Sequence, residues 1–163
     1  MSAEPFSHLD RRGRAAMVDV SDKDTTRRVA EASCRVLLSG GTVRRLEKLP
    51  KGDALTVARV AGVQAAKSTA TWVPLAHPLP LDQVEVEIEP GEGGVTVRSR
   101  VVVTARTGAE MEALTACAAA ALALYDMVKS VERGAVITDL LLEAKSGGQS
   151  GEYLRGEYRR SGA

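Results

Sequence analysis

The chain has 163 residues, of which 44% are hydrophobic and 26% are charged, and its formal net charge is +1. These proportions are those of an ordinary globular domain with enough apolar material for a core, so neither a metal nor a disulfide is required to hold it together. The near-neutral charge argues against a general nucleic-acid binder, and five aromatic residues are too few for a base-stacking platform.

The first 16 residues are polar and arginine-rich without any periodicity, and we expect a mobile arm there. The opening stretch MSAEPFSHLD lacks the apolar segment of a secretory signal. The longest apolar run, residues 113–125, is shorter than the ~20 residues that span a bilayer. We therefore expect a cytoplasmic protein that binds neither a membrane nor nucleic acid.

The first predicted strand covers residues 27–38, where alternate positions are apolar. The residues expected on its buried face are Ala30, Ala32, Cys34, Val36 and Leu38. Both cysteines of the chain, Cys34 and Cys117, lie in apolar segments, and the sequence has no CxxC motif and no Cys/His cluster. We therefore predict two buried reduced thiols and no structural zinc site.

A turn and a short helix that ends at Pro50 lead into a predicted helix over residues 53–69, with Asp53 as its N-cap. Small residues recur along one side of this helix and allow another element to approach closely; they are Ala58, Ala61, Gly62, Ala65 and Ala66. The segment TWVPLAHPLPL follows. We predict that it is extended, because proline disfavours helix at the residue before it.

Residues 84–89 and 95–105 alternate between apolar and polar around a PGEGG turn, which predicts an antiparallel hairpin with one solvated face. Its expected inward residues are Val84, Val86, Ile88, Val95, Val97, Val101 and Val103. A long alanine-rich helix is predicted over residues 109–133, with Gly134 as its stop. A last strand over residues 135–145 and a glycine-rich end complete the chain.

This order of strands and helices predicts an α+β fold of the ferredoxin-like (split βαβ) type, an antiparallel sheet with helices packed on one face. We expect one domain over residues 17–151 and a partly mobile tail over residues 152–163. The helical segment 113–125 is apolar on all sides, whereas a small sheet covers only one side. A covering partner is therefore expected, most simply a second copy of the chain.

Two polar residues follow directly on this apolar helical segment. At about 100° per residue, Asp126 lies about 60° from Lys129, at the end of a stripe that includes Leu114 and Leu122. The two residues form either a surface ion pair or part of a site, and the pattern alone favours neither. At the helix start, Thr107 and Glu110 fit a capping box.

Each of four further residues can be interpreted either as part of a functional site or as an ordinary structural or surface residue. Glu112 is either an exposed first-turn carboxylate or a ligand contact. Lys51, before a helix start, and Lys145, before a glycine-rich loop, suit phosphate binding, although a solvated lysine has the same pattern. His77, on an apolar extended segment, is either a packing residue or a proton-transfer residue.

Five segments together closely resemble the molybdenum cofactor biosynthesis protein C family, the cyclic pyranopterin monophosphate synthases. They lie between about residues 17 and 151 and read MVDVSDK, KGDALTVARVAGVQAAK, LAHPL, TARTGAEMEALTACAAAALALYDMVKSVE and LLEAKSGGQSG. The resemblance implies a phosphorus–oxygen lyase that rearranges 3′,8-cyclo-7,8-dihydroguanosine 5′-triphosphate to cyclic pyranopterin monophosphate and releases pyrophosphate. It also implies a hexamer, built as a trimer of dimers, with sites at subunit interfaces.

By matching position, the resemblance assigns catalytic roles to Asp126, Lys129, Lys51 and His77. It assigns substrate binding to Leu75, Ala76, His77, Met111, Glu112, Lys145 and Arg28. We hypothesise that Asp126 and Lys129 act as an acid/base pair, that His77 and Glu112 hold the purine-derived part, and that the other cations contact phosphate. No metal site is expected in the protein, and Mg²⁺ bound with the triphosphate remains an open possibility.

The chain departs from the family pattern at two positions. Ala76 stands where the family usually has cysteine, so the chemistry does not depend on a thiol there, and Gln149 stands where lysine is frequent. Two other functions remain open on the residues alone: a non-catalytic nucleotide-binding module of the same fold, and a purely structural assembly subunit. Neither function requires an acid and an amine at the end of an apolar helix.

Overall fold

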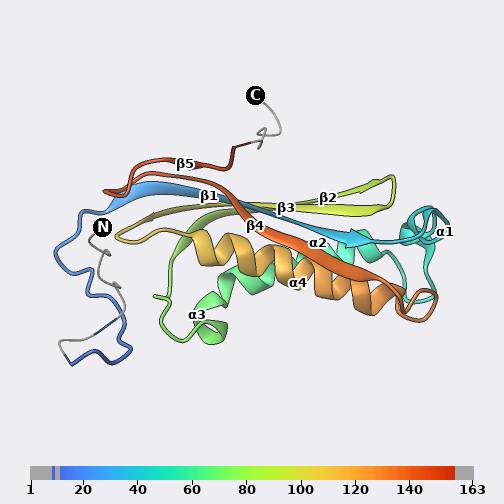
Figure 1. The fold of residues 1–163 in the computed structure, drawn as a ribbon, viewed down its shortest axis with the longest axis horizontal. Helices are drawn as coiled ribbons and strands as arrows, with labels where there is room; N and C mark the ends of the chain where they lie inside the picture. Colours follow the sequence, from blue (N-terminus) through green and yellow to red (C-terminus); the bar gives the residue numbers. More distant parts are fainter. Residues whose placement is uncertain (1–8, 10–11, 157–163) are drawn as a thin grey trace.

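The computed structural model describes residue 9 and residues 12–156, and the structural statements below concern those residues. The main elements are β1 (Thr26–Leu37), α2 (Ala54–Lys67), β2 (Leu81–Gly91), β3 (Gly94–Ala105), α4 (Glu110–Val128) and β4 (Val136–Ser146). Shorter ones are α1 (Gly40–Val43), η1 (Leu46–Lys48), α3 (Thr69–Trp72) and β5 (Tyr153–Leu154). Their order confirms the predicted α+β ferredoxin-like fold (Figure 1).

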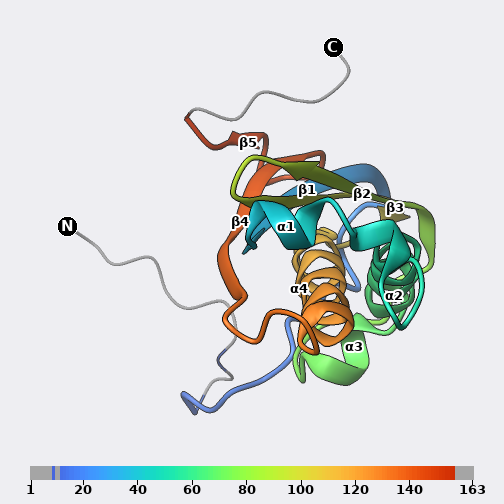
Figure 2. The same cartoon turned by 90° about the vertical axis from the view of Figure 1, so that its right-hand side faces the viewer.

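All five strands pair antiparallel, in the order β2-β3-β1-β4-β5. The central strand β1 pairs with β3 on one side and with β4 on the other, so Val29 lies opposite both Val102 and Ser146. Helices α2 and α4 lie side by side on one face of this sheet (Figure 2). The sheet and the two helices therefore form two layers with the core between them.

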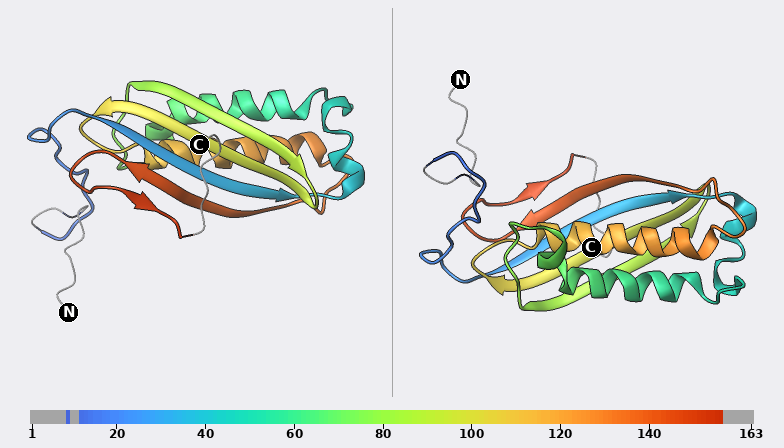
Figure 3. Two further views of the ribbon diagram at one scale, coloured as in Figure 1. Left: turned by 90° about the horizontal axis from the view of Figure 1, so that it is seen from above. Right: turned by 90° about the horizontal axis from the view of Figure 1, so that it is seen from below.

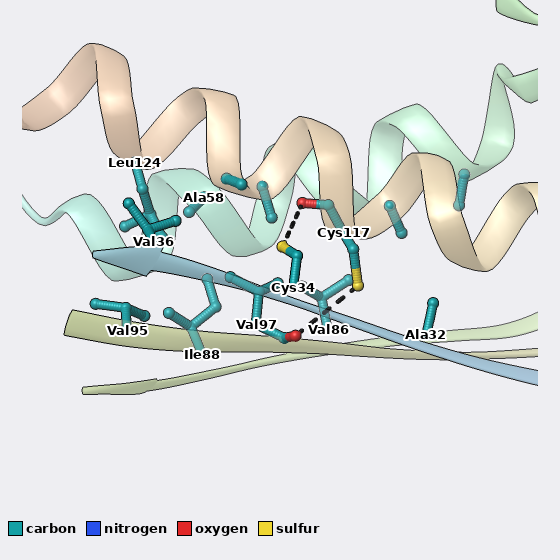
Figure 4. Packing of buried hydrophobic residues seen from close by; sticks show 14 of the residues in the cluster. Ala32, Cys34, Val36, Ala58, Val86, Ile88, Val95, Val97, Cys117 and Leu124 are labelled. Atoms are coloured by element: carbon teal, nitrogen blue, oxygen red, sulfur yellow. Dashed lines mark hydrogen bonds between the residues drawn. The ribbon is translucent and has the colours of Figure 1, made fainter. Parts of the chain in front are cut away.

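Alternation along the strands places the core residues as the sequence predicts, except that Val84 of β2 is only half-buried. All five residues expected on the inner face of β1 are buried, and so are the four valines expected on the inner face of β3. Figure 4 shows Cys34 and Val36 of β1 beneath Cys117 and Leu124 of α4. Cys34 Sγ lies 3.5 Å from the Cys117 carbonyl oxygen, and both thiols are buried and free of disulfide bonds, as predicted.

The close approach predicted for α2 is confirmed at Gly62. A β-carbon added there would lie 2.9 Å from the carbonyl oxygen of Ala116 in α4, so only glycine fits this crossing. The predicted N-cap is also confirmed, because the Asp53 carboxylate accepts the backbone N–H groups of Leu55 (2.9 Å) and Thr56 (3.2 Å). Helix α2 is thereby fixed both at its start and along its length.

Two predicted boundaries are wrong. Thr71 and Trp72 belong to α3 rather than to an extended segment, because the restriction imposed by Pro74 reaches only the residue before it. Helix α4 ends at Val128 rather than at Arg133. A turn in which the N–H groups of Val131 and Glu132 donate to the Val128 carbonyl oxygen follows before Gly134. The Glu132 carboxylate there accepts the backbone N–H (2.9 Å) and the hydroxyl (2.9 Å) of Ser39, which ties the turn to the end of β1.

Helix α4 is long and apolar enough to be a membrane-span candidate by length and composition, with a mean hydropathy of 1.4, but 61% of that stretch is buried in the fold. It serves here as the core helix. An apolar stripe on its outer side remains uncovered on the single chain, where Met111 is 39% and Leu122 is 55% exposed. Leu114, Ala118 and Tyr125 lie half-buried along the same stripe.

The predicted domain limits remain predictions. Most of the expected arm, residues 1–16, and of the expected tail, residues 152–163, lies outside the described residues. Within the described part, residues 153–154 form β5, which adds a short strand to the edge of β4.

Candidate functional site

Three of the predicted catalytic residues meet at the C-terminal end of α4. The Asp126 carboxylate lies between two ammonium groups, with Lys51 Nζ 2.9 Å from Oδ2 and Lys129 Nζ 2.6 Å from Oδ1. Lys51 also donates a hydrogen bond to the Asp126 carbonyl oxygen at 3.0 Å. Because Lys51 comes from a distant part of the chain, this cluster is more than the local ion pair that the helix spacing allows.

The fold brings Lys51 to this end because α2 and α4 run in opposite directions, so the start of α2 lies beside the end of α4 (Figure 3). Lys51 sits in a tight turn closed by a bridge between Leu49 and Gly52, and Gly52 has a φ of +106° that favours glycine. An aspartate in the last turn of a helix is disfavoured by the helix dipole. The two lysines offset that cost at Asp126.

The cluster is charged in the single chain. Hydrogen bonds from Lys129 and Lys51 lower the pKa of Asp126 to about 2, and the Asp126 carboxylate raises the pKa of Lys129. All three side chains are about half exposed, at 42% for Lys51, 53% for Asp126 and 51% for Lys129. The carboxylate is therefore a permanent anion at neutral pH, with two cations held beside it and open to a ligand.

Glu112 lies at the other end of α4 and is only 3% exposed, so the reading of it as an exposed first-turn carboxylate is wrong. Burial raises the pKa of Glu112 to about 7, and the negative charge of Glu110 acts in the same direction. A carboxyl group that titrates near neutral pH is suited to take up or release a proton. Met111 beside it is 39% exposed.

The predicted substrate-binding residues 75–77 lie in the segment that follows α3, and α3 contacts α4. Leu75, Ala76 and His77 are all half-buried. Hydrogen bonds from Ser21 lower the pKa of Asp19, and His77 acts weakly in the same direction. The sequence predicted no role for Asp19. It could have been noticed as an acidic residue within MVDVSDK, one of the segments that resemble the family.

A polar pocket of about 160 Å³ opens where β1, the start of α4 and the glycine-rich loop after β4 meet. Its cations are Lys23, Arg28, Arg106 and Lys145. Arg28 is fixed by donating to the carbonyl oxygens of Ala105 (3.2 Å) and Arg106 (3.1 Å). The pocket thus unites Arg28 and Lys145, two of the three cations predicted to contact phosphate, whereas the third, Lys51, lies at the other end of α4 beside Asp126.

The predicted capping box at the start of α4 is wrong. The N-cap is Ala109, without any side-chain hydrogen bond, and Glu110 pairs instead with Lys145, whose Nζ lies 2.7 Å from Oε1. Glu110 pairs with Lys145 because a charged ammonium group forms a stronger hydrogen bond with the carboxylate than the neutral backbone N–H of Thr107 would. Gly108 and Ala109 line the basic pocket together with Glu110, whose negative charge Lys145 offsets, so the uncapped helix start faces a space with a net positive lining.

The predicted residues therefore fall into two groups at opposite ends of α4. Glu112 and Asp126 are separated by about 21 Å at a rise of 1.5 Å per residue. One end, the acid–amine end, holds Asp126, Lys129 and Lys51. The other, the pocket end, holds Arg28, Lys145, Met111, Glu112 and residues 75–77. Within one chain the helix keeps the two groups apart.

No cluster suited to a metal ion occurs in residue 9 or residues 12–156: nowhere among them do three or more His, Cys, Asp or Glu side chains converge.

Known relatives match almost the whole chain. Residues 17–148 match the MoaC family. A cyclic pyranopterin monophosphate synthase from Streptomyces griseus is 53% identical over 152 residues, which cover 92% of this chain and 86% of that protein. One from a Nocardioides species is 52% identical over 162 residues, covering 95% and 99% of the two chains. One from Thermomicrobium roseum is 51% identical over 154 residues, covering 92% and 93%.

Proposed function

The chain belongs to the MoaC family, and from that membership we propose that it is a cyclic pyranopterin monophosphate synthase of molybdenum cofactor biosynthesis. The proposed substrate is 3′,8-cyclo-7,8-dihydroguanosine 5′-triphosphate, and the products are cyclic pyranopterin monophosphate and pyrophosphate. This is a phosphorus–oxygen lyase reaction, for which we propose a cytoplasmic location. Any Mg²⁺ would arrive with the triphosphate as part of the substrate.

The observation that carries the proposal is the position of Asp126 between two lysines. The reaction needs proton transfers at the nitrogens of the purine as its five-membered ring opens. It also needs a sugar hydroxyl to attack the α-phosphorus while pyrophosphate departs. Ammonium groups beside a fixed anion can donate protons and stabilise the negative charge that develops on the leaving group.

The pKa shifts refine the roles that the sequence suggested. With its pKa lowered to about 2, Asp126 is a poor proton carrier near neutral pH. We therefore assign Asp126 to holding Lys51 and Lys129 in place, and the lysines to stabilising the negative charge on the departing pyrophosphate. Glu112, with its pKa raised to about 7, is the better candidate for proton exchange at the pterin-forming part of the substrate, which His77 would help to hold.

The proposed site is shared between two copies of the chain. A two-fold axis relating two α4 helices side by side would place the pocket end of one chain against the acid–amine end of the other. The uncovered stripe of α4, which includes Leu122 and Met111, supports such a contact because it would bury exposed apolar surface. A homohexamer built as a trimer of dimers would contain this pairing in each dimer.

The test is to incubate the purified chain with the cyclised triphosphate and to measure pyrophosphate release and substrate binding separately. We expect turnover by the wild-type chain. In Asp126→Asn and Lys129→Ala we expect a loss of kcat of roughly 10²-fold or more with binding retained. Asp139→Asn serves as control, since Asp139 is exposed on β4 and its φ of +52° suits asparagine.

Each other result points to a different function. Binding of the triphosphate by the wild-type chain without pyrophosphate release would indicate a nucleotide-binding module. Absence of binding would indicate an assembly subunit. Full turnover in Asp126→Asn would contradict the assignment of the acid–amine cluster.

A further inference from the structure

The glycine-rich loop of residues 146–151 forms one wall of the basic pocket. Ser146, Gly147 and Ser150 line the pocket together with Lys145 and Arg28. The loop runs very close to β1: a β-carbon on Gly147 would lie 2.3 Å from the Arg27 carbonyl oxygen, and one on Gly148 would lie 2.3 Å from the Arg28 guanidinium. The position of this loop therefore sets the width of the pocket.

On its far side, within the part of the chain that the structure describes, the loop is followed by β5, which is two residues long. Tyr153 pairs with Lys145 and Leu154 with Ala144, and both β5 side chains are exposed, at 39% and 57%. So short a strand without buried side chains contributes little stability of its own. A contact beyond β5 would therefore help to hold the loop in place.

Arg155, the residue after β5, provides that contact. Its backbone N–H donates to the Glu143 carbonyl oxygen at 2.8 Å, and its Nε donates to the Leu142 carbonyl oxygen at 3.1 Å. The same Nε lies 3.5 Å from Glu143 Oε2. Arg155 thus fastens the end of the β4–β5 hairpin with two hydrogen bonds and an ion pair.

Glu143 is an unusual partner because it is a buried carboxylate on the sheet face away from the helices. It is 7% exposed, and its Oε1 accepts the hydroxyl of Ser33 in β1 at 2.5 Å. A buried carboxylate that loses its cation is strongly destabilised. The buried Glu143 carboxylate therefore favours keeping Arg155 close. Through Ser33 and Arg155, Glu143 joins β1 at the centre of the sheet to the end of the β4–β5 hairpin.

We propose that Glu143 and Arg155 form a clamp that seats the loop of residues 146–151 against Arg28 and so preforms the basic pocket for the phosphates of the substrate. Arg155 is a positioning residue, since it acts on the loop and not on the ligand. The inference rests on the proposed function for its ligand. It predicts weaker phosphate binding, and not a slower chemical step, when the clamp is removed.

The experiment compares Arg155→Ala with Arg98→Ala, which removes a matched surface Arg–Glu pair, Arg98–Glu89, on the β2–β3 hairpin. Inorganic tripolyphosphate serves as the probe in titration calorimetry, and the cyclised triphosphate serves in steady-state kinetics. For Arg155→Ala we expect about tenfold weaker tripolyphosphate binding and about tenfold higher KM, with kcat changed less than about twofold. Arg155→Lys should recover most of the binding, and Glu143→Gln should resemble Arg155→Ala.

Amide hydrogen exchange on the same proteins reports the loop directly. Residues 147–151 should exchange faster in Arg155→Ala than in Arg98→Ala, while β1 and α4 remain protected. Equal exchange and equal tripolyphosphate affinity in the two variants would overturn the clamp, as would a wild-type chain that does not bind tripolyphosphate. If the wild-type chain binds tripolyphosphate but releases no pyrophosphate from the cyclised triphosphate, the proposed function is wrong. The tripolyphosphate affinities of Arg155→Ala and Arg98→Ala would still test the clamp.

Discussion

Glu112 is the residue whose protonation is most altered by the fold. An unfolded glutamate has a pKa near 4.5, whereas burial raises that of folded Glu112 to about 7. Between these values the folded chain keeps a proton that the unfolded chain has released, so unfolding releases a proton and the free energy of unfolding falls as pH rises from about 4.5 to about 7. The contribution is on the order of 3 kcal/mol.

Glu112→Gln tests this directly, because glutamine stays neutral. Denaturant unfolding at several pH values should show the wild-type chain losing stability relative to Glu112→Gln across that interval. A constant difference between the two chains from pH 4.5 to 7 would contradict a raised pKa at this position.

The cysteines offer a second residue-scale prediction. Cys34 and Cys117 are fully buried, and the contact of Cys34 with Cys117 together with its burial raises the pKa of the Cys34 thiol. We expect neither thiol to react with a thiol-specific reagent in the native protein, both to react after unfolding, and iodoacetamide to leave turnover unchanged. Because the predicted substrate-binding residues 75–77 include no cysteine, rapid inactivation by iodoacetamide would contradict this account.

A contact between two side chains could be predicted only where both lie on one element and the spacing along the sequence brings them together. The spacing of Asp126 and Lys129 on one helix predicted their proximity, and the structure adds Lys51 to the same carboxylate. The partner of Glu110 was not predictable, because Lys145 lies on another element and approaches only through the pairing of β4 with β1. The burial of Glu112 was not predictable either, since acidic residues in the first turn of a helix are usually exposed.

At the scale of elements, the crossing of α2 and α4 depends on Gly62. In an isolated helix, Gly→Ala is stabilising by about 1 kcal/mol. At Gly62 the added methyl group would meet the Ala116 carbonyl oxygen at 2.9 Å and Val86 at 3.1 Å, so the helices must separate. We expect Gly62→Ala to lower the free energy of unfolding by about 1–3 kcal/mol.

Gly134→Ala is the matched control, because nothing lies within 4 Å of its added β-carbon. Its free energy of unfolding should change by less than about 0.5 kcal/mol. If Gly62→Ala were as stable as Gly134→Ala, the close crossing of the two helices would be contradicted.

The elements themselves were largely predictable because their periodicities are clear. Strand alternation identified the buried face of β1 and β3, and the small residues of α2 indicated a close helix contact. The ends of α3 and α4 were not predictable. Trp72 is helical despite the prolines after it, and α4 ends at Val128, before the turn in which Glu132 contacts Ser39 from a distant part of the chain.

At the scale of the whole molecule, the uncovered stripe of α4 predicts self-association. Leu122 is 55% exposed on the single chain, so Leu122→Lys should change the stability of the isolated fold by less than about 0.5 kcal/mol. It should nevertheless abolish assembly, because a charge would be buried in an apolar contact. Sedimentation should show the wild-type chain as an oligomer and the variant as a monomer; an unchanged oligomer would exclude the stripe as the interface.

The separation of the candidate site into two groups could not be predicted from the chain order alone. It depends on α2 and α4 running in opposite directions, which brings Lys51 to Asp126 and leaves Glu112 about 21 Å away along α4. In the proposed mechanism a complete site therefore combines two copies of the chain, and this is its central claim.

The most direct measurement is a mixing experiment with two inactive variants, Asp126→Asn and His77→Ala, which damage opposite ends of the chain. If each site combines the two ends from different copies, chains mixed at random should regain about a quarter of the wild-type rate of pyrophosphate release, since one site in four contains neither substitution. Mixed oligomers that form and remain inactive would contradict a site shared between copies.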